Sequence, residues 1–82
     1  MYLARIVVTL RKSILDPQGK AVHHALESLS MAAVQEVRIG KFIEMKIDAG
    51  TREDAEKIAT AACTRLLANP VMEDFSFSVD EL

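Results

Sequence analysis

The fold of this 82-residue chain is decided by residues 34–48, which read VQEVRIGKFIEMKID. Hydrophobic side chains take one parity of this stretch, and charged side chains take the other. The hydrophobic set comprises Val37, Ile39, Ile43, Met45 and Ile47, and the charged set comprises Glu36, Arg38, Glu44, Lys46 and Asp48. Because successive side chains of a strand point to opposite faces, this pattern predicts a β-strand with one buried face.

Gly40-Lys41 interrupts the alternation and leaves two topologies open. A two-residue hairpin here would put Val37 and Ile39 on the face opposite Ile43, because the facing flips with each single-residue shift. A three-residue turn, or one strand bent at Gly40, keeps these side chains on one face. We favour the long bent strand, because the usual three-residue turn has glycine at its last position rather than its first.

Two further strands are predicted near the ends of the chain. Residues 2–10 alternate, with Tyr2, Ala4, Ile6, Val8 and Leu10 on a purely hydrophobic face. The other face of this strand is half hydrophobic, as expected where a sheet lies against another subunit. Residues 75–79 place Phe75, Phe77 and Val79 opposite serines, which predicts a half-exposed final strand.

Two helices are predicted between the strands. The first begins at Asp16, whose carboxylate can accept hydrogen bonds from first-turn amides, with Pro17 at the first helical position. The second begins at Thr51 and ends at Asn69-Pro70. Their hydrophobic stripes comprise Ala21, Val22, Ala25, Leu26 and Leu29, and then Ala55, Ile58, Ala59, Ala62, Leu66 and Leu67. Gly19 costs about 1 kcal/mol relative to alanine in a helix, so we expect another segment to approach its backbone closely.

Together these segments predict one α+β domain covering residues 1–82. We expect two helices packed on one face of a mostly antiparallel sheet, in the order β-α-β-α-β with a long bent middle strand. The variant is a ferredoxin-like β-α-β-β-α-β order, in which the middle strand is split at Gly40.

Composition favours self-association. A chain of 82 residues buries only about 60% of its accessible surface on folding, yet 50% of its residues are hydrophobic. Both facts are met if part of the hydrophobic surface is covered by a partner, and an unusually well-packed monomer is the alternative. The net charge of −2 gives no general attraction to nucleic acid or to anionic membranes, and no hydrophobic run approaches the ~20 residues of a membrane span. With a single cysteine and no predicted signal peptide, we expect a cytoplasmic protein.

No catalytic constellation is predicted. Cys63 lies on the hydrophobic stripe of the second helix, with no histidine nearby in sequence and away from the helix N-terminus, where low-pKa cysteines usually occur. His23 and His24 point about 100° apart on a helix, and His23 with Glu27 supplies only two ligands of the four in a structural zinc site. The acidic residues near the C-terminus, Glu73, Asp74, Asp80 and Glu81, are read as a solvated face. The chain also lacks a glycine-rich phosphate loop and the stacking aromatics of an RNA-binding sheet.

Three motifs carry a family resemblance. They are LDPQG at residues 15–19 followed by Ala21-Val22 and Ala25-Leu26, VRIGKFIE at residues 37–44, and LANPVMEDF at residues 67–75. In this order and spacing, and over essentially the whole chain, the sequence resembles the PurS family, the small subunits of phosphoribosylformylglycinamidine synthase. Family members often have Pro-Gly where this chain has Lys12-Ser13, and glycine where it has Ser30. Ser30 then either avoids the left-handed conformation or adopts it at a cost of about 1 kcal/mol.

The resemblance implies a non-catalytic subunit of an ATP- and glutamine-dependent ligase in de novo purine biosynthesis. It implies a dimer or tetramer that bridges a synthetase subunit (PurL-type) and a glutaminase subunit (PurQ-type) and supports ammonia transfer. ATP, magnesium and glutamine are then used by the complex, and this chain itself holds no cofactor.

Interface residues are predicted at two places. We expect the helix start, Asp16, Pro17, Gln18 and Gly19, and the bend, Arg38, Gly40 and Lys41, to contact the larger subunits. Both places contain glycine or exposed polar groups without an obvious reason in the fold, and turn chemistry alone is the alternative for Asp16-Pro17. Val7 and Phe42 on the sheet faces are the candidates for self-association. The rival function is a ferredoxin-like regulatory domain that binds a small ligand at a subunit interface, with the segment from Asp16 to Gly19 as its ligand loop.

Overall fold

The computed structural model describes residues 1–82 as three strands, two α-helices and one π-helical turn. In chain order these are β1 (Tyr2–Leu10), α1 (Pro17–Ser28), β2 (Gly40–Ile47), α2 (Arg52–Ala62), the π-helical turn η1 (Cys63–Leu67) and β3 (Glu73–Glu81). Neither α-helix is long and apolar enough to cross a membrane. The α+β class and the β-α-β-α-β order are confirmed.

The sheet is antiparallel, with β1 in the centre and the order β2-β1-β3. Ile6 of β1 lies between Ile43 of β2 and Phe77 of β3. The even-numbered residues Ala4, Ile6 and Val8 are fully buried, as their alternation predicts. Burying a side chain of the size of Ile6 contributes about 1.5–3 kcal/mol, so this face of β1 is the centre of the core.

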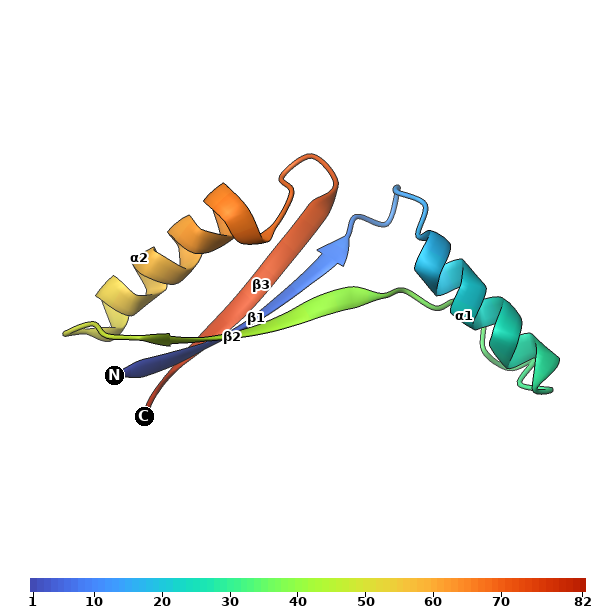
Figure 1. The fold of residues 1–82 in the computed structure, drawn as a ribbon, viewed down its shortest axis with the longest axis horizontal. Helices are drawn as coiled ribbons and strands as arrows, with labels where there is room; N and C mark the ends of the chain where they lie inside the picture. Colours follow the sequence, from blue (N-terminus) through green and yellow to red (C-terminus); the bar gives the residue numbers. More distant parts are fainter.

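Helix α2 covers part of the core face of the sheet (Figure 1). It lies over β1 and β3. Ala55, Ala59 and Cys63 are fully buried against the strands, and their small side chains let the helix approach closely. The predicted stripe is only partly buried, since Ile58 is 47% exposed and Leu66 is 82% exposed. The helix is therefore rotated so that its alanines, rather than its largest residues, face the sheet.

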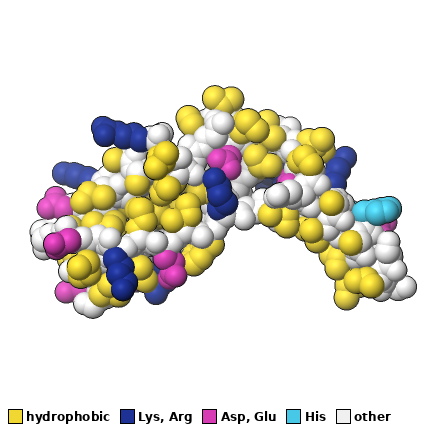
Figure 2. All heavy atoms as spheres, viewed as in Figure 1, with side chains coloured by type: hydrophobic (Ala, Val, Ile, Leu, Met, Phe, Trp, Pro, Cys, Tyr) yellow, Lys and Arg dark blue, Asp and Glu magenta, His cyan; other side chains and the backbone are white.

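Helix α1 lies beyond the end of the sheet instead of on its face, which corrects its predicted position (Figure 1). The chain measures 51 × 27 × 14 Å, and its radius of gyration is 16.2 Å. A compact domain of this length would have a radius of about 12 Å. Figure 2 shows the resulting arch, with hydrophobic side chains at the surface of both limbs. The hydrophobic stripe of α1 is open to solvent, with Val22 40% and Leu29 69% exposed.

The middle segment is continuous, with no hairpin at Gly40, as we favoured. The paired strand is nevertheless shorter than predicted, because β2 begins at Gly40 and only residues 40–47 bond to β1. Residues 35–39 continue past the sheet alongside α1 without a partner strand. We call α1 together with residues 29–39 the arm.

The helix ends follow the predicted chemistry. The Asp16 carboxylate accepts from the Gly19 amide, and Thr51 Oγ1 accepts from the Asp54 amide at 3.2 Å. Ser30 adopts the left-handed conformation, with φ of 67°. Serine carries a cost of about 1 kcal/mol there, so this helix end is strained where glycine would be relaxed.

Candidate subunit-interface site

Asp16 joins the start of α1 to the end of the arm, where the chain enters β2. It is 4% exposed; Oδ1 accepts a hydrogen bond from the Gly19 amide at 2.9 Å, and Oδ2 accepts one from the Ile39 amide at 2.7 Å. The bond from Ile39, then that from Gly19, and the nearby Arg38 charge hold the pKa of Asp16 below its usual value, although burial acts in the opposite direction. One carboxylate thus fixes two backbone segments, and we call this junction the elbow, comprising residues 14–19 and 37–41.

Two glycines of the elbow are required by close backbone packing. A Cβ at Gly19 would lie 2.2 Å from the Val37 carbonyl oxygen, and one at Gly40 would lie 2.5 Å from the Val8 carbonyl oxygen. Neither glycine has a positive φ, so space rather than backbone conformation selects them. The predicted close approach at Gly19 is confirmed, and it comes from the chain's own backbone.

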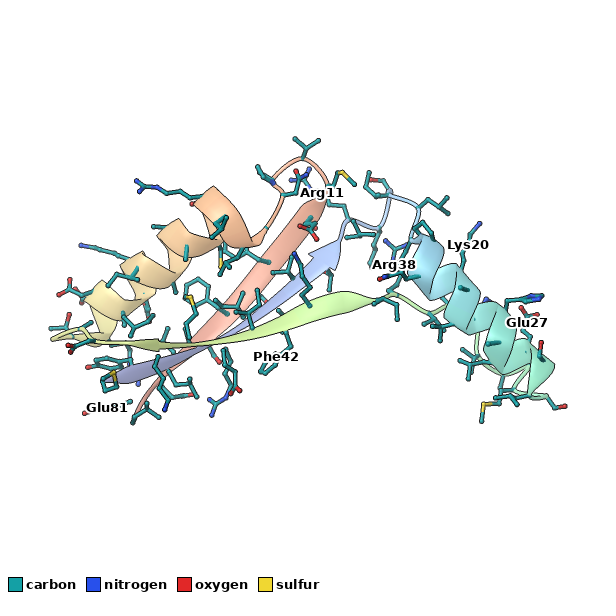
Figure 3. The ribbon with its side chains drawn as sticks, viewed as in Figure 1. Arg11, Lys20, Glu27, Arg38, Phe42 and Glu81 are labelled. Carbon is teal, nitrogen blue, oxygen red and sulfur yellow. The ribbon has the colours of Figure 1, made fainter.

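Arg38 fastens the β1–α1 loop to the elbow (Figure 3). One Nη2 donates to the carbonyl oxygens of Arg11 at 2.9 Å and Ile14 at 3.0 Å, with a longer contact to Leu10 at 3.5 Å. The roles of Arg38 and Gly40 in the fold, and the bond from the Ile39 amide to Asp16, are contacts that sequence reasoning missed. These contacts join residues that are far apart in sequence, so no local pattern could reveal them.

The exposed candidates lie around one shallow hollow on the elbow. It is lined by Leu10, Asp16, Gln18, Ile39, Gly40, Lys41 and Glu73. Pro17 and Gln18 are exposed at the helix start. Lys41 Nζ donates to the Leu67 carbonyl at 3.3 Å and lies 3.9 Å from the Glu73 carboxylate. The structure therefore brings the helix start and the bend together, as a polar surface with one cation beside one anion.

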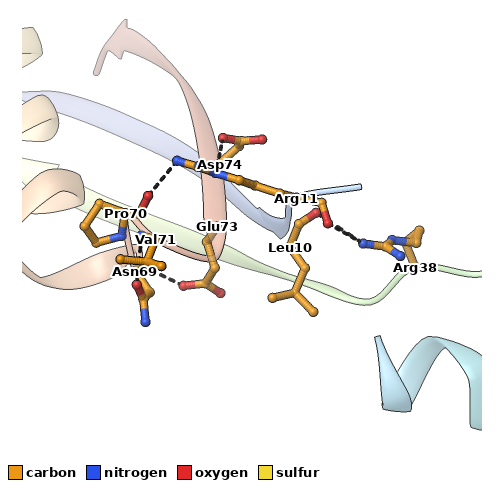
Figure 4. A network of polar contacts seen from close by, with 8 residues as sticks. All are labelled: Leu10, Arg11, Arg38, Asn69, Pro70, Val71, Glu73 and Asp74. Atoms are coloured by element: carbon orange, nitrogen blue, oxygen red, sulfur yellow. Dashed lines mark hydrogen bonds and ion pairs between the residues drawn. The ribbon is translucent and has the colours of Figure 1, made fainter. Parts of the chain in front are cut away.

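A second polar network, which sequence reasoning missed, closes the same end of the sheet (Figure 4). Arg11 Nη2 donates to the Pro70 carbonyl at 2.6 Å, and its Nε lies 3.3 Å from Asp74. Glu73 accepts from the Asn69 amide at 2.8 Å. These contacts hold the start of β3 next to the elbow.

The self-association candidates Val7 and Phe42 lie directly opposite each other in the β1–β2 ladder. Val7 is 42% exposed and Phe42 61%. Phe42 points to the side of the sheet away from α2 (Figure 3), and its ladder partner Val7 shares that face. Arg5 on the same face forms a hydrogen-bonded ion pair with Asp80. This face combines exposed hydrophobic side chains with charges and serines at its margins.

The residues weighed for catalysis have structural surroundings. Cys63 is fully buried, and burial raises the pKa of its thiol, which disfavours the reactive thiolate. His23 Nε2 lies 2.8 Å from the Val34 carbonyl oxygen, so His23 helps to hold the arm together. Three or more His, Cys, Asp or Glu side chains gather nowhere in a way that could hold a metal ion.

Comparison with known proteins identifies relatives over the full chain. The family model described as PurS, phosphoribosylformylglycinamidine (FGAM) synthase, matches residues 3–81. The PurS subunit of the Bacillus subtilis synthase is 45% identical over 100% of this chain and 96% of its own length. The Synechocystis PurS subunit is 43% identical over 99% of this chain and 81% of its own length.

Solved structures share the conformation as well as the sequence. A crystal form of B. subtilis PurS has a TM-score of 0.89 at 46% identity, covering 99% of this chain and 100% of that one. A chain in the structure of PurLQS from Thermotoga maritima has a TM-score of 0.86 at 28% identity, covering 98% and 99% of the two chains. Because the likeness extends over the whole length, it includes the projecting arm. The chain belongs to the PurS family of phosphoribosylformylglycinamidine synthase subunits.

Proposed function

We propose that this chain is the small, non-catalytic subunit of phosphoribosylformylglycinamidine synthase in purine biosynthesis, in the cytoplasm. It bridges a synthetase subunit and a glutaminase subunit and supports ammonia transfer between them. The single observation that carries this proposal is full-length membership of the PurS family, whose relatives are named as subunits of that synthase. A PurS-like chain in the T. maritima PurLQS structure supports the identity of the two partners.

The chemistry of the reaction is assigned to the partners. In this chain the only thiol is fully buried and has a raised pKa. Three of the acidic side chains near the C-terminus form ion pairs: Asp80 with Arg5, Asp74 with Arg11 and Glu73 with Lys41. The donor set does not fit a magnesium–nucleotide site, since no cluster of three potential ligands exists and the sequence has no glycine-rich phosphate loop. We assign the use of ATP, magnesium and glutamine to the synthetase and glutaminase subunits.

Self-association is proposed through the sheet face that carries Val7 and Phe42. Exposed hydrophobic side chains on a sheet face with no helix over it are typical of a contact between two sheets. Phe42→Ser is expected to weaken this contact while leaving the core intact, because Phe42 is 61% exposed in the single chain.

The elbow is the proposed contact with the larger subunits, through its exposed members Pro17, Gln18 and Lys41. Asp16, Gly19, Arg38 and Gly40 hold the surface that presents them. The rigid packing of the elbow supports this role, because a binding surface loses less conformational entropy when its backbone is already fixed.

The function is tested by co-purification of the tagged chain with the synthetase and glutaminase from the same source. We expect a ternary complex, and recovery of neither subunit would contradict the proposal. Gln18→Arg and Lys41→Glu are expected to weaken the complex about tenfold or more, whereas Lys57→Glu on the outer face of α2 serves as the matched control. A full-strength complex with both elbow variants would leave the subunit assignment standing and reject the elbow as the contact.

The rival regulatory function loses its proposed ligand loop. Both carboxylate oxygens of Asp16 already accept backbone hydrogen bonds within the chain, and the space beside Gly19 is filled by Val37. A small ligand would have to displace these contacts.

A further inference from the structure

Strand β3 has a row of unpaired backbone groups along the outer edge of the sheet. It is an edge strand, because the sheet order is β2-β1-β3. At the two ends of its ladder with β1, the Arg11 amide bonds to the Met72 carbonyl and the Leu82 amide bonds to the Met1 carbonyl. Bonded and non-bonded pairs alternate in an antiparallel ladder. The even-numbered residues of β3 therefore bond to β1, and the backbone groups of its odd-numbered residues point outward.

The outward amide and carbonyl groups of Phe75 and Phe77 have no partner within the chain. At Val79 the outward carbonyl accepts a hydrogen bond from the Arg52 side chain, which agrees with this assignment of the ladder. Unpaired peptide groups along a sheet edge are a template to which another extended segment can bond. The free part of the edge is thus centred on the two phenylalanines.

The middle of this edge lacks the features that usually protect an edge strand. Residues 75–79 read FSFSV, with no charge and no proline, and the register with β1 continues without a bulge. Phe75 and Phe77 are half-buried, and their ring centroids lie 6.4 Å apart at an interplanar angle of 12°. The two rings therefore offer hydrophobic surface directly beside the unpaired backbone.

A hollow of about 210 Å³ adjoins Phe75, where the end of α2 meets the start of β3. Its hydrophobic lining includes Cys63, Ala68 and Phe75, and Arg11 lies at its polar side. A side chain that projects from an added strand beside Phe75, towards α2, would enter this hollow. The edge and the hollow are thus suited to the same occupant.

A second copy of β3 does not fit this edge. Full antiparallel overlap, centred on Phe77, would place Glu73 opposite Glu81 and Asp74 opposite Asp80. A shift of two residues would place Glu73 opposite Val79 in one direction and Glu81 opposite Phe75 in the other. Like charges directly opposite each other destabilise an antiparallel pair, so the acidic ends of β3 disfavour its pairing with itself.

We infer that an extended segment of a larger subunit adds to β3 as a further strand. This inference rests on the proposed function and names the kind of contact that one partner makes. The added segment has hydrophobic side chains beside Phe75 and Phe77 and a basic side chain beside Glu81. Glu81 is free for such a partner, because it has no ion pair within the chain, whereas the other carboxylates of β3 pair with Arg5, Arg11 and Lys41. The edge is continuous with the elbow, since Glu73 begins β3 and also lines the elbow hollow.

Amide hydrogen exchange, measured residue by residue, tests the new backbone bonds directly. In the purified chain the amides of Phe75 and Phe77 should exchange fast, whereas those of Ser76 and Ser78, which bond to β1, should exchange slowly. In the complex with the synthetase and the glutaminase, exchange at Phe75 and Phe77 is expected to slow about tenfold or more. Protection at alternate residues distinguishes strand addition from a contact made by side chains alone.

The possible outcomes separate this inference from the proposed function. A full-strength complex in which Phe75 and Phe77 still exchange fast would overturn strand addition and leave the subunit assignment standing. Failure to form any complex would overturn both. Slow exchange of the same two amides in the purified chain would show that a second copy covers the edge, which would also overturn the inference.

Substitutions at Glu81 test the edge without changing the core. Glu81→Pro removes an outward amide and leaves the bonds to β1 in place, Glu81→Gln removes only the charge, and Glu81→Lys reverses it. Glu81→Pro and Glu81→Lys are each expected to raise the Kd of the complex about fivefold or more, with a smaller effect of Glu81→Gln. Glu56→Lys on the outer face of α2 is the matched control for charge reversal. Wild-type affinity in both Glu81→Pro and Glu81→Lys would contradict the inference.

Discussion

Gly19→Ala tests the packing of the elbow, which sets the orientation of the arm. The added Cβ would meet the Val37 carbonyl oxygen at 2.2 Å, and Cβ contacts under 3.0 Å essentially never occur. The carbonyl must therefore withdraw by roughly 0.8 Å. Such a movement would also stretch the hydrogen bond between the Ile39 amide and Asp16, which is 2.7 Å long.

Two opposed terms set the size of the effect. Alanine is favoured over glycine in a helix by about 1 kcal/mol. Forcing an extra carbon into a packed site costs about 1–3 kcal/mol, and the upper half of that range applies here because the obstacle is backbone. We expect net destabilisation of about 1–2 kcal/mol, or a fall in Tm of about 5–15 °C for a domain of this size.

The assay is urea unfolding followed by circular dichroism, at one protein concentration because an oligomer's stability depends on it. Gly50→Ala is the matched control, since a Cβ there meets nothing within 4 Å and the backbone has no positive φ. We expect the control to be stabilised by about 0.4–1 kcal/mol. If Gly19→Ala is as stable as Gly50→Ala, the close packing of α1 against residues 37–39 is refuted.

Three further predictions concern single residues. The pKa of Asp16 is lowered in the folded chain, so the Asp16 carboxylate stabilises the fold above its unfolded pKa near 3.8, and this stabilisation is lost as pH falls through the folded pKa. The difference in stability between wild type and Asp16→Asn should therefore close on acidification, as measured by urea midpoints between pH 7 and pH 2. A gap that is constant with pH would contradict this. Ser30→Gly should stabilise the chain by up to about 1 kcal/mol, because Ser30 is held at φ of 67°, and an unchanged or lower Tm would count against it. Cys63 should resist alkylation by iodoacetamide in the native state and react once urea unfolds the chain, whereas fast native modification would show that α2 opens readily.

Local patterns predicted the elements well, because each depends on neighbouring residues. Asp16 and Pro17 mark the start of α1, and the alternation of residues 2–10 gives both the span and the buried face of β1. The resemblance carried by three motifs predicted the family, which the comparisons confirm. The alternation of residues 34–48 left a hairpin open, and the position of Gly40, first rather than last in a possible turn, correctly favoured a continuous segment.

The sequence could not show whether a hydrophobic surface is covered by the same chain or by a partner. The hydrophobic stripe of α1 and the alternation of residues 35–39 both predict burial, but a stripe does not say against which molecule. The same limit applies to the interface candidates. Gly19 and Gly40 are needed because the backbones of Val37 and Val8, which are far away in sequence, pack against them. Ile58 and Leu66 were expected in the core for their size, whereas the sheet receives the smaller alanines of α2.

The central claim, that this chain serves catalysis only by assembling its partners, is tested most directly by reconstitution. The synthetase and glutaminase subunits are mixed with and without this chain, and product formation is measured with glutamine and then with ammonium chloride as the nitrogen source. We predict that omitting the chain abolishes glutamine-dependent synthesis while ammonia-dependent synthesis and ATP use by the synthetase continue. Full glutamine-dependent synthesis without the chain would contradict the account, as would loss of the ammonia-dependent reaction on its removal.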